Sequence, residues 1–123
     1  MPYDLRIIRS REVVRLDAEG HFDIAATRAL FLDVMWTCSR SQIGCVLLDI
    51  RDATAQVTAA QLCSLADAAS EVSAPTGDHK IAILTRPEHQ FDRASLLAIT
   101  VQGEGWNIAA FDSFECAFEW LIS

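Results

Sequence analysis

Acidic, basic, hydroxyl and imidazole side chains follow three short apolar runs of the sequence, at residues 45–50, 80–85 and 107–111. Continuous apolar runs of this length predict strands buried on both faces, as in parallel sheets. Ligands of open α/β sheets bind beyond the carboxyl ends of such strands. We therefore expect one site region that holds a small polar ligand or receives a loop of a partner protein. Its candidate residues are Asp49, Arg51, Asp52, Thr54, Thr85, Arg86, His89 and Asp112.

The same residues also fit ordinary structural roles, and we favour that interpretation over a ligand site. Asp112, with Glu115 three residues later, has the spacing of a capping box for the last helix. Arg51 can pair with a nearby acid. Asp49 is expected to accept hydrogen bonds from loop N–H groups, because an unpaired buried charge is costly.

Metal, redox and common catalytic patterns are missing from the sequence. His21, His79 and His89 match no metal motif, and the four cysteines form no C-x-x-C pair. The sequence also has no G-x-S-x-G, P-loop or G-x-G-x-x-G motif. We expect a protein that is not an enzyme, with no cofactor or metal and with buried cysteines that act as small hydrophobes. An enzymatic alternative requires Asp49, Arg86 and His89 to converge around a cleft.

Composition narrows the class of partner. The 123 residues fit a single domain, 1–123, and carry a net charge of −7 with one lysine. Nucleic-acid backbones and anionic membranes require clustered Lys and Arg, so both are disfavoured. No apolar run reaches the ~20 residues of a membrane span, and the first residues lack a signal-peptide pattern. We expect a cytoplasmic protein.

Apolar periodicity predicts alternating strands and helices. Residues 3–9 and 13–18 fit an antiparallel hairpin, which Gly20 and His21 interrupt. A helix follows at 24–39, a strand at 45–50, a polar loop at 51–57 and a second helix from Thr58 to the turn at 75–78. A strand at 80–85, a helix from Pro87 to Gly103, a strand at 107–111 and a final helix complete the chain. The expected fold is α/β, a mixed sheet of five strands with right-handed parallel crossovers and four helices.

Three segments resemble the STAS domain, and more closely its SpoIIAA-like branch, whose fold is related to the CRAL-TRIO lipid-binding domain. They are residues 13–16 (Val-Val-Arg-Leu) followed by Gly20, residues 46–52 (Val-Leu-Leu-Asp-Ile-Arg-Asp) and residues 111–121 (Phe-Asp-Ser-Phe-Glu-Cys-Ala-Phe-Glu-Trp-Leu). The likeness covers nearly the whole chain and implies a SpoIIAA/STAS-like domain that regulates or binds another protein.

The resemblance also implies a position for a phospho-acceptor. STAS regulators of the anti-sigma-factor antagonist type carry a phosphorylated serine, within Asp-Ser-Ser-Gly, at the start of the helix after the central strand. Here residues 57–60 read Val-Thr-Ala-Ala, so Thr58 stands at this position without the family's preceding Asp or following Gly. Thr58, with Gln61 three residues later, also fits a capping box, the interpretation that we favour.

Two functional hypotheses follow. The first is a non-enzymatic regulatory module that binds a protein partner. The alternative is a carrier or sensor of a small apolar or lipid-like ligand, as the CRAL-TRIO relationship implies, which needs a cavity of at least ~300 Å³. The widely apolar helix at 24–39, with Trp36, together with Trp106 and Trp120, fits core packing, a lipid cavity or the interface of a homodimer.

Overall fold

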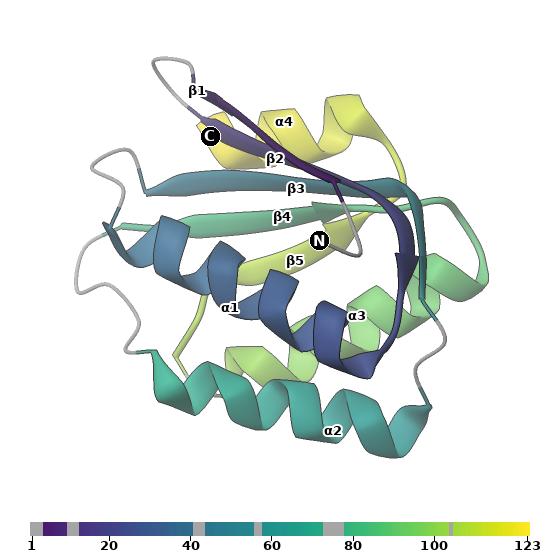
Figure 1. Cartoon of the computed structure of the whole chain (residues 1–123). Coiled ribbons are helices and arrows are strands. Elements are labelled where there is room, and N and C mark those ends of the chain that lie inside the picture. The colour runs from purple at the N-terminus through teal and green to yellow at the C-terminus, as the bar shows by residue number, and fades with distance from the viewer. Residues whose placement is uncertain (1–3, 10–12, 41–43, 56–57, 73–77, 104) are drawn as a thin grey trace.

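One mixed sheet organises the computed structural model, and within the described residues its five strands lie in the order β1-β2-β3-β4-β5 (Figure 1). β1 (Asp4–Arg9) pairs antiparallel with β2 (Val14–Phe22). β3 (Cys45–Ala55), β4 (Lys80–Leu84) and β5 (Ile108–Phe111) then add as parallel neighbours. The structure describes residues 4–9, 13–40, 44–55, 58–72, 78–103 and 105–123.

The helices form unequal layers on the two faces of the sheet (Figure 1). α1 (Ile24–Arg40) and α3 (His89–Gln102) pack on one face. α2 (Ala59–Ala68) packs chiefly on those two helices, as an outer layer. α4 (Phe114–Ile122) packs alone on the opposite face, against β3, β4 and β5. The three helices α1, α2 and α3 therefore enclose space that α4 does not.

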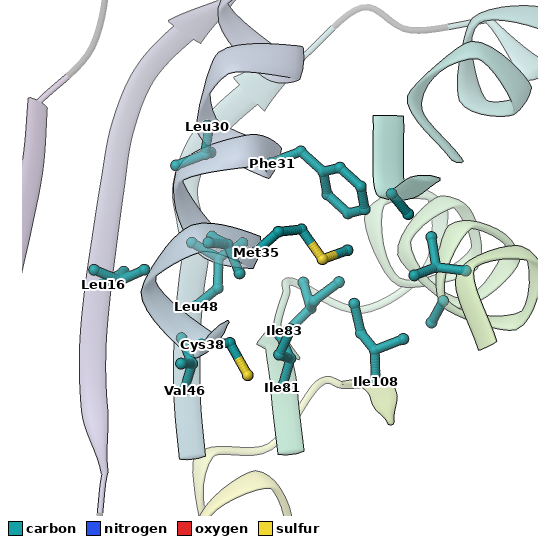
Figure 2. Close-up of a cluster of buried hydrophobic side chains, with 14 of the residues drawn as sticks. Leu16, Leu30, Phe31, Met35, Cys38, Val46, Leu48, Ile81, Ile83 and Ile108 are labelled. Carbon is teal, nitrogen blue, oxygen red and sulfur yellow. The ribbon is translucent and has the colours of Figure 1, made fainter. Parts of the chain in front are cut away.

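The larger core lies between the sheet and α1. Phe31, Met35 and Cys38 recur at helical spacing on the buried face of α1. Figure 2 shows Met35 extending from α1 toward Ile83, and Cys38 lying near Val46 and Ile81. Burial raises the pKa of the Cys38 thiol to about 12, with a smaller contribution from Cys45. Cys38 therefore acts as a small hydrophobe, as expected, whereas Cys116 is exposed.

Strand alternation sorts the side chains of β3 between the two cores. Val46 and Leu48 face α1, whereas Leu47 lies between them in sequence and packs in the α4 core with Ala117 and Leu121. This parity continues to Asp49 and Arg51 and places them on the α4 side; the register shift that follows returns Ala53 to the core on the α1 side.

Two strands are longer than the sequence predicts. β2 continues through Gly20 and His21, which were expected to end it, and β3 continues through residues 51–55, which were expected to form a loop. The extensions pair with each other beyond the end of β4, after a register shift at Asp17/Glu19. Polar residues are tolerated there because only Phe22 and Ala53 turn inward, so most of the extension keeps a wet face.

The observed helix caps match those predicted from the sequence at two positions and differ from the prediction at a third. Asp23 Oδ1 accepts a hydrogen bond from Ala26 N at 2.7 Å at the start of α1. Thr58 and Gln61 form the expected capping box at α2, with hydrogen bonds of 3.0 and 3.2 Å. At α4 the cap is Ser113, not Asp112, because the helix begins one residue later than the predicted cap requires. In the described part of the chain, no helix is long and apolar enough to cross a membrane.

Candidate functional site

The polar residues that follow the strands lie on opposite sides of the sheet. Asp49 and Arg51 bind each other on the α4 side, together with Arg15 of β2. Arg86 and His89 line a cavity on the side of α1, α2 and α3. Asp49, Arg86 and His89 therefore do not converge, and the enzymatic alternative, which requires them to do so, loses its geometric basis.

Asp49 is the centre of a closed ionic network on the α4 face. Its side chain is 10% exposed. It accepts hydrogen bonds from Arg15 Nη2 at 2.9 Å, from Arg51 Nη2 at 2.8 Å, from Arg51 Nε at 3.1 Å and from the backbone N–H of Arg51 at 3.0 Å. Arg15 Nε donates in turn to Asp17 at 2.7 Å, and its guanidinium lies over the Phe114 ring of α4.

This network fixes the charge state of Asp49. Burial by itself raises the pKa of the carboxyl, but the hydrogen bonds and charge of Arg51, with the charge of Arg15, outweigh burial and lower the pKa below its ordinary value. A carboxylate held ionised by four donors is a weak base and an effective anchor. The structural role expected for Asp49 is thus the one that its contacts support.

Three further candidates lie outside the cavity. Thr85 is buried, and its hydroxyl donates to the carbonyl oxygen of Arg86 at 2.8 Å. Asp52 is exposed on β3, and Asp112 is exposed in the turn between β5 and α4. None of the three lines the cavity as described.

The cavity has a volume of about 350 Å³ and lies at the carboxyl ends of the parallel strands. Its wall is mainly apolar and comes from six elements, β2, α1, β3, α2, β4 and α3. Ligand cavities in proteins have volumes from about 300 Å³ upward and walls of this composition. The apolar lining includes Phe22, Leu30, Phe31, Ile50, Leu65 and Leu97.

The polar part of the wall comes mainly from the amino end of α3 and the loop before it. Arg86, His89, Gln90 and Arg93 all line the cavity. His89 and Arg93 are four residues apart, and so project from the same side of the helix. Thr27 and Thr54 add hydroxyls from α1 and β3. Among the described lining residues there is no Asp or Glu.

We call the polar part of the wall formed by Arg86, His89, Gln90 and Arg93 the rim. Gln90 binds the rim to the carboxyl end of β3. Its Nε2 donates to the carbonyl oxygens of Ile50 and Ala53 at 3.0 and 3.1 Å, and its Oε1 accepts from Arg86 N at 2.6 Å. Arg86 Nη2 also donates to Ala53 O at 3.3 Å. The glutamine amide is thereby used within the protein, and Arg86, His89 and Arg93 are the charged or titratable groups of the described lining.

The residue before α3 has a strained backbone. Glu88 has φ 71° and ψ −124°, and it is the one non-glycine residue with positive φ in the described ranges. Such conformations cost roughly 1–3 kcal/mol and concentrate at functional sites. The strain lies directly beside His89, at the mouth of the cavity.

Sequence reasoning found Thr54, Arg86 and His89 of this cavity and missed Gln90, Arg93 and Thr27. The spacing of four residues from His89 to Arg93 was an available signal. The apolar wall gave no separate signal, because its residues have the same spacing as core residues. Within the described residues, no group of three His, Cys, Asp or Glu side chains could hold a metal ion.

Comparisons with known proteins identify the fold. No family model and no curated protein matches the sequence. Among solved structures, an anti-sigma factor antagonist from Mycobacterium paratuberculosis is similar at a TM-score of 0.60 and 12% identity, over 98% of this chain and 95% of that chain. An uncharacterized protein with a SpoIIAA-like fold from Shewanella loihica is similar at a TM-score of 0.53 and 17% identity, over 97% and 93%. The chain therefore has a SpoIIAA-like α/β fold.

Proposed function

We propose that this protein is a non-enzymatic binding module of SpoIIAA-like fold, and that its cavity receives a small, mainly apolar ligand. The observation that carries the proposal is the cavity of about 350 Å³ between α1, α2, α3 and the strand ends. Its volume exceeds the ~300 Å³ that a carrier or sensor needs. Its place, beyond the carboxyl ends of parallel strands, is the usual ligand position in open α/β sheets.

The contacts of Asp49 support a non-enzymatic role. The acid with the most buried position at the strand ends is bound by Arg15 and Arg51, on the face away from the cavity. A general base needs access to the proton that it removes and a pKa near the working pH. Asp49 has a lowered pKa and is covered by its partners.

Native mass spectrometry of the protein purified from its source cells tests the proposal. We expect a mass excess that disappears on denaturation. Ala94→Phe places a ring in the cavity wall and should remove the excess, whereas Ile99→Phe changes an exposed residue of the same helix and should retain it. A ligand-free mass, together with failure of the purified protein to bind an apolar fluorescent probe, would contradict the proposal.

A second candidate function is regulation through a protein partner. It is favoured by the similarity to a protein described as an anti-sigma factor antagonist, over nearly the full length of both chains. Thr58 is exposed at the start of α2, and a phosphate at a helix amino end is electrostatically stabilised. Phosphorylation of Thr58 in source cells, detected by mass spectrometry and lost in Thr58→Val, would support this role. A consistently unmodified Thr58 would argue against phospho-regulation here.

Self-association is a related proposal. Trp36 is 43% exposed on α1, with the Arg40 guanidinium 4.5 Å from its ring centroid. A homodimer would cover this face. Light scattering gives the molar mass of the wild type and of Trp36→Glu in solution, and the substitution should convert a dimer to a monomer. A monomeric wild type at high concentration would exclude a stable dimer through Trp36.

A further inference from the structure

We infer that the cavity is built for an anionic amphiphile, a single apolar chain that ends in a carboxylate or a similar anionic group. The inference rests on the proposed function, since it names the chemical class of ligand for the same cavity. It depends on where the charged and the apolar lining residues lie, not on the volume alone.

The charge of the rim is opposite to the charge of the protein. The chain carries a net charge of −7, yet the charged or titratable residues among the described lining are Arg86, His89 and Arg93. The acids Glu88 and Asp92 are neighbours of these residues in sequence and are not part of the lining. Guanidinium groups bind carboxylate and phosphate through paired hydrogen bonds. The amino end of α3 adds a favourable field for an anion.

Polarity falls along both α3 and α1, from the amino end of each helix onward. On α3 the lining changes from His89 and Arg93 to Leu97, one helical turn at a time. On α1 it changes from Thr27 to Leu30 and Phe31. A ligand with an anionic group at the strand ends and an apolar chain directed toward the interior matches this gradient.

Leu65 of α2 belongs to the apolar part of the cavity wall. It is 1% exposed and packs with Leu97 and Ile24. Apart from Arg86, His89 and Arg93 the described lining offers no charged partner, so a second charged group placed among the apolar residues would be buried without compensation. This favours an amphiphile with one charged end over a dicarboxylate or a nucleotide.

The volume limits the chain length. A cavity of about 350 Å³ has room for about a dozen groups of the size of a water molecule, each occupying roughly 30 Å³. A medium-length chain such as decanoate fits this volume, while a diacyl phospholipid can insert only part of one chain.

Calorimetric titration of the full chain with decanoate, decanol and decylammonium tests the inference. We expect decanoate to bind about tenfold more tightly than decanol, since one charge-assisted contact is worth that factor. Decylammonium should bind most weakly. Arg86→Gln/Arg93→Gln should lower the decanoate affinity about tenfold and leave decanol unchanged. Arg28→Gln/Arg40→Gln removes two positive charges outside the described lining and should leave both affinities unchanged.

The outcomes separate the inference from the proposed function. Equal affinity for decanoate and decanol would overturn the anionic ligand and keep an apolar cavity ligand. No binding of any of the three compounds would overturn both. If the double variant fails to fold, Arg86→Gln and Arg93→Gln are measured singly, and each should lower the decanoate affinity while leaving that for decanol unchanged.

Binding to lipid vesicles distinguishes two sources of an anionic amphiphile, a soluble carboxylate and an anionic membrane lipid. Binding of free decanoate without binding to phosphatidylglycerol vesicles would identify a soluble carboxylate as the ligand class. Binding to phosphatidylglycerol vesicles that is lost in Arg86→Gln/Arg93→Gln, with no binding to phosphatidylcholine vesicles, would identify an anionic lipid. Vesicle binding that the arginine substitutions do not change would count against the cavity as the site.

Discussion

On the α4 face, the polar residues of β2 and β3 neutralise one another. Asp49 is surrounded by Arg15 and Arg51, and the core on the same face is filled by side chains such as Ala117 and Leu121. On the other face, the rim of Arg86 and Arg93 borders open apolar volume. The same edge of one sheet thus supports a packed anchor on one side and an unfilled cavity on the other.

The difference follows from the number of helices on each face. On one face a single helix, α4, lies directly on the sheet, and its small residue Ala117 is fully buried against the strands. On the other face α2 rests on α1 and α3, and the gap beneath α2 is closed by side chains such as Leu65. A layer of helices supported by other helices leaves room that a single helix does not.

The largest expected effect compares the same substitution on the two faces. Ala117→Phe places a ring in the packed α4 core and should lower the free energy of unfolding by about 3 kcal/mol. Ala94→Phe places it in the cavity and should be neutral or raise the free energy by about 1 kcal/mol. Urea denaturation measures both. Equal losses would mean that the cavity side is packed as tightly as the α4 side.

Removal of the anchor should have the next largest effect. Asp49→Ala leaves Arg15 and Arg51 without their shared acceptor and should lower the free energy of unfolding by about 2 kcal/mol, since both arginines are partly exposed. Asp52→Ala, an exposed acid on the same strand, is the matched control and should change it by less than about 0.5 kcal/mol. Decanoate affinity should stay constant in both variants. A weakened affinity in Asp49→Ala alone would show that the two faces are coupled.

Relief of strain at the cavity mouth should give a smaller change of opposite sign. Glu88→Gly removes the side chain from a residue at φ 71° and should raise the free energy of unfolding by about 1 kcal/mol. If the strain serves the rim, ligand affinity should fall while stability rises. Glu115→Gly, in the first turn of α4, is the control and should lower stability.

The lowered pKa of Asp49 predicts a pH dependence that belongs to the α4 face. Because the folded pKa lies below the unfolded value of about 3.9, the folded chain binds fewer protons. Its contribution to stability is complete above the unfolded pKa and is lost as the pH falls through the folded pKa. Denaturation midpoints of Asp49→Asn should therefore fall less than those of the wild type below about pH 4. Parallel curves would show that other carboxyls dominate acid unfolding.

Much of the fold could be predicted from local patterns in the sequence. The helical spacing from Phe31 to Cys38 and the capping box of Thr58 and Gln61 are local signals, and the structure has both. The extensions of β2 and β3 could not be predicted, because their pairing depends on two segments more than thirty residues apart. When each segment is considered by itself, its polar residues predict a loop.

The sequence predicted a site region at the edge of the sheet where the cavity lies, but its candidate residues come from both faces of the sheet. Strand parity alone separates Asp49 and Arg51 from the side of Leu48 and Ile50, and this signal was present in the sequence. The cavity itself could not be predicted from local patterns in the sequence. It depends on how far α2 stands from the strands, which is set by the packing of Leu65 against Leu97 rather than by any motif.

The support of α2 by helices has a kinetic consequence. Because α2 rests chiefly on α1 and α3, it can lift from the molecule without breaking any hydrogen bond of the sheet. Amide hydrogens of α2 should then exchange with solvent well before those of β3 and β4, through an opening smaller than global unfolding. Such an opening exposes Leu65 and the apolar end of the cavity together. The rate of this local opening would set an upper limit on how fast a chain enclosed there could leave.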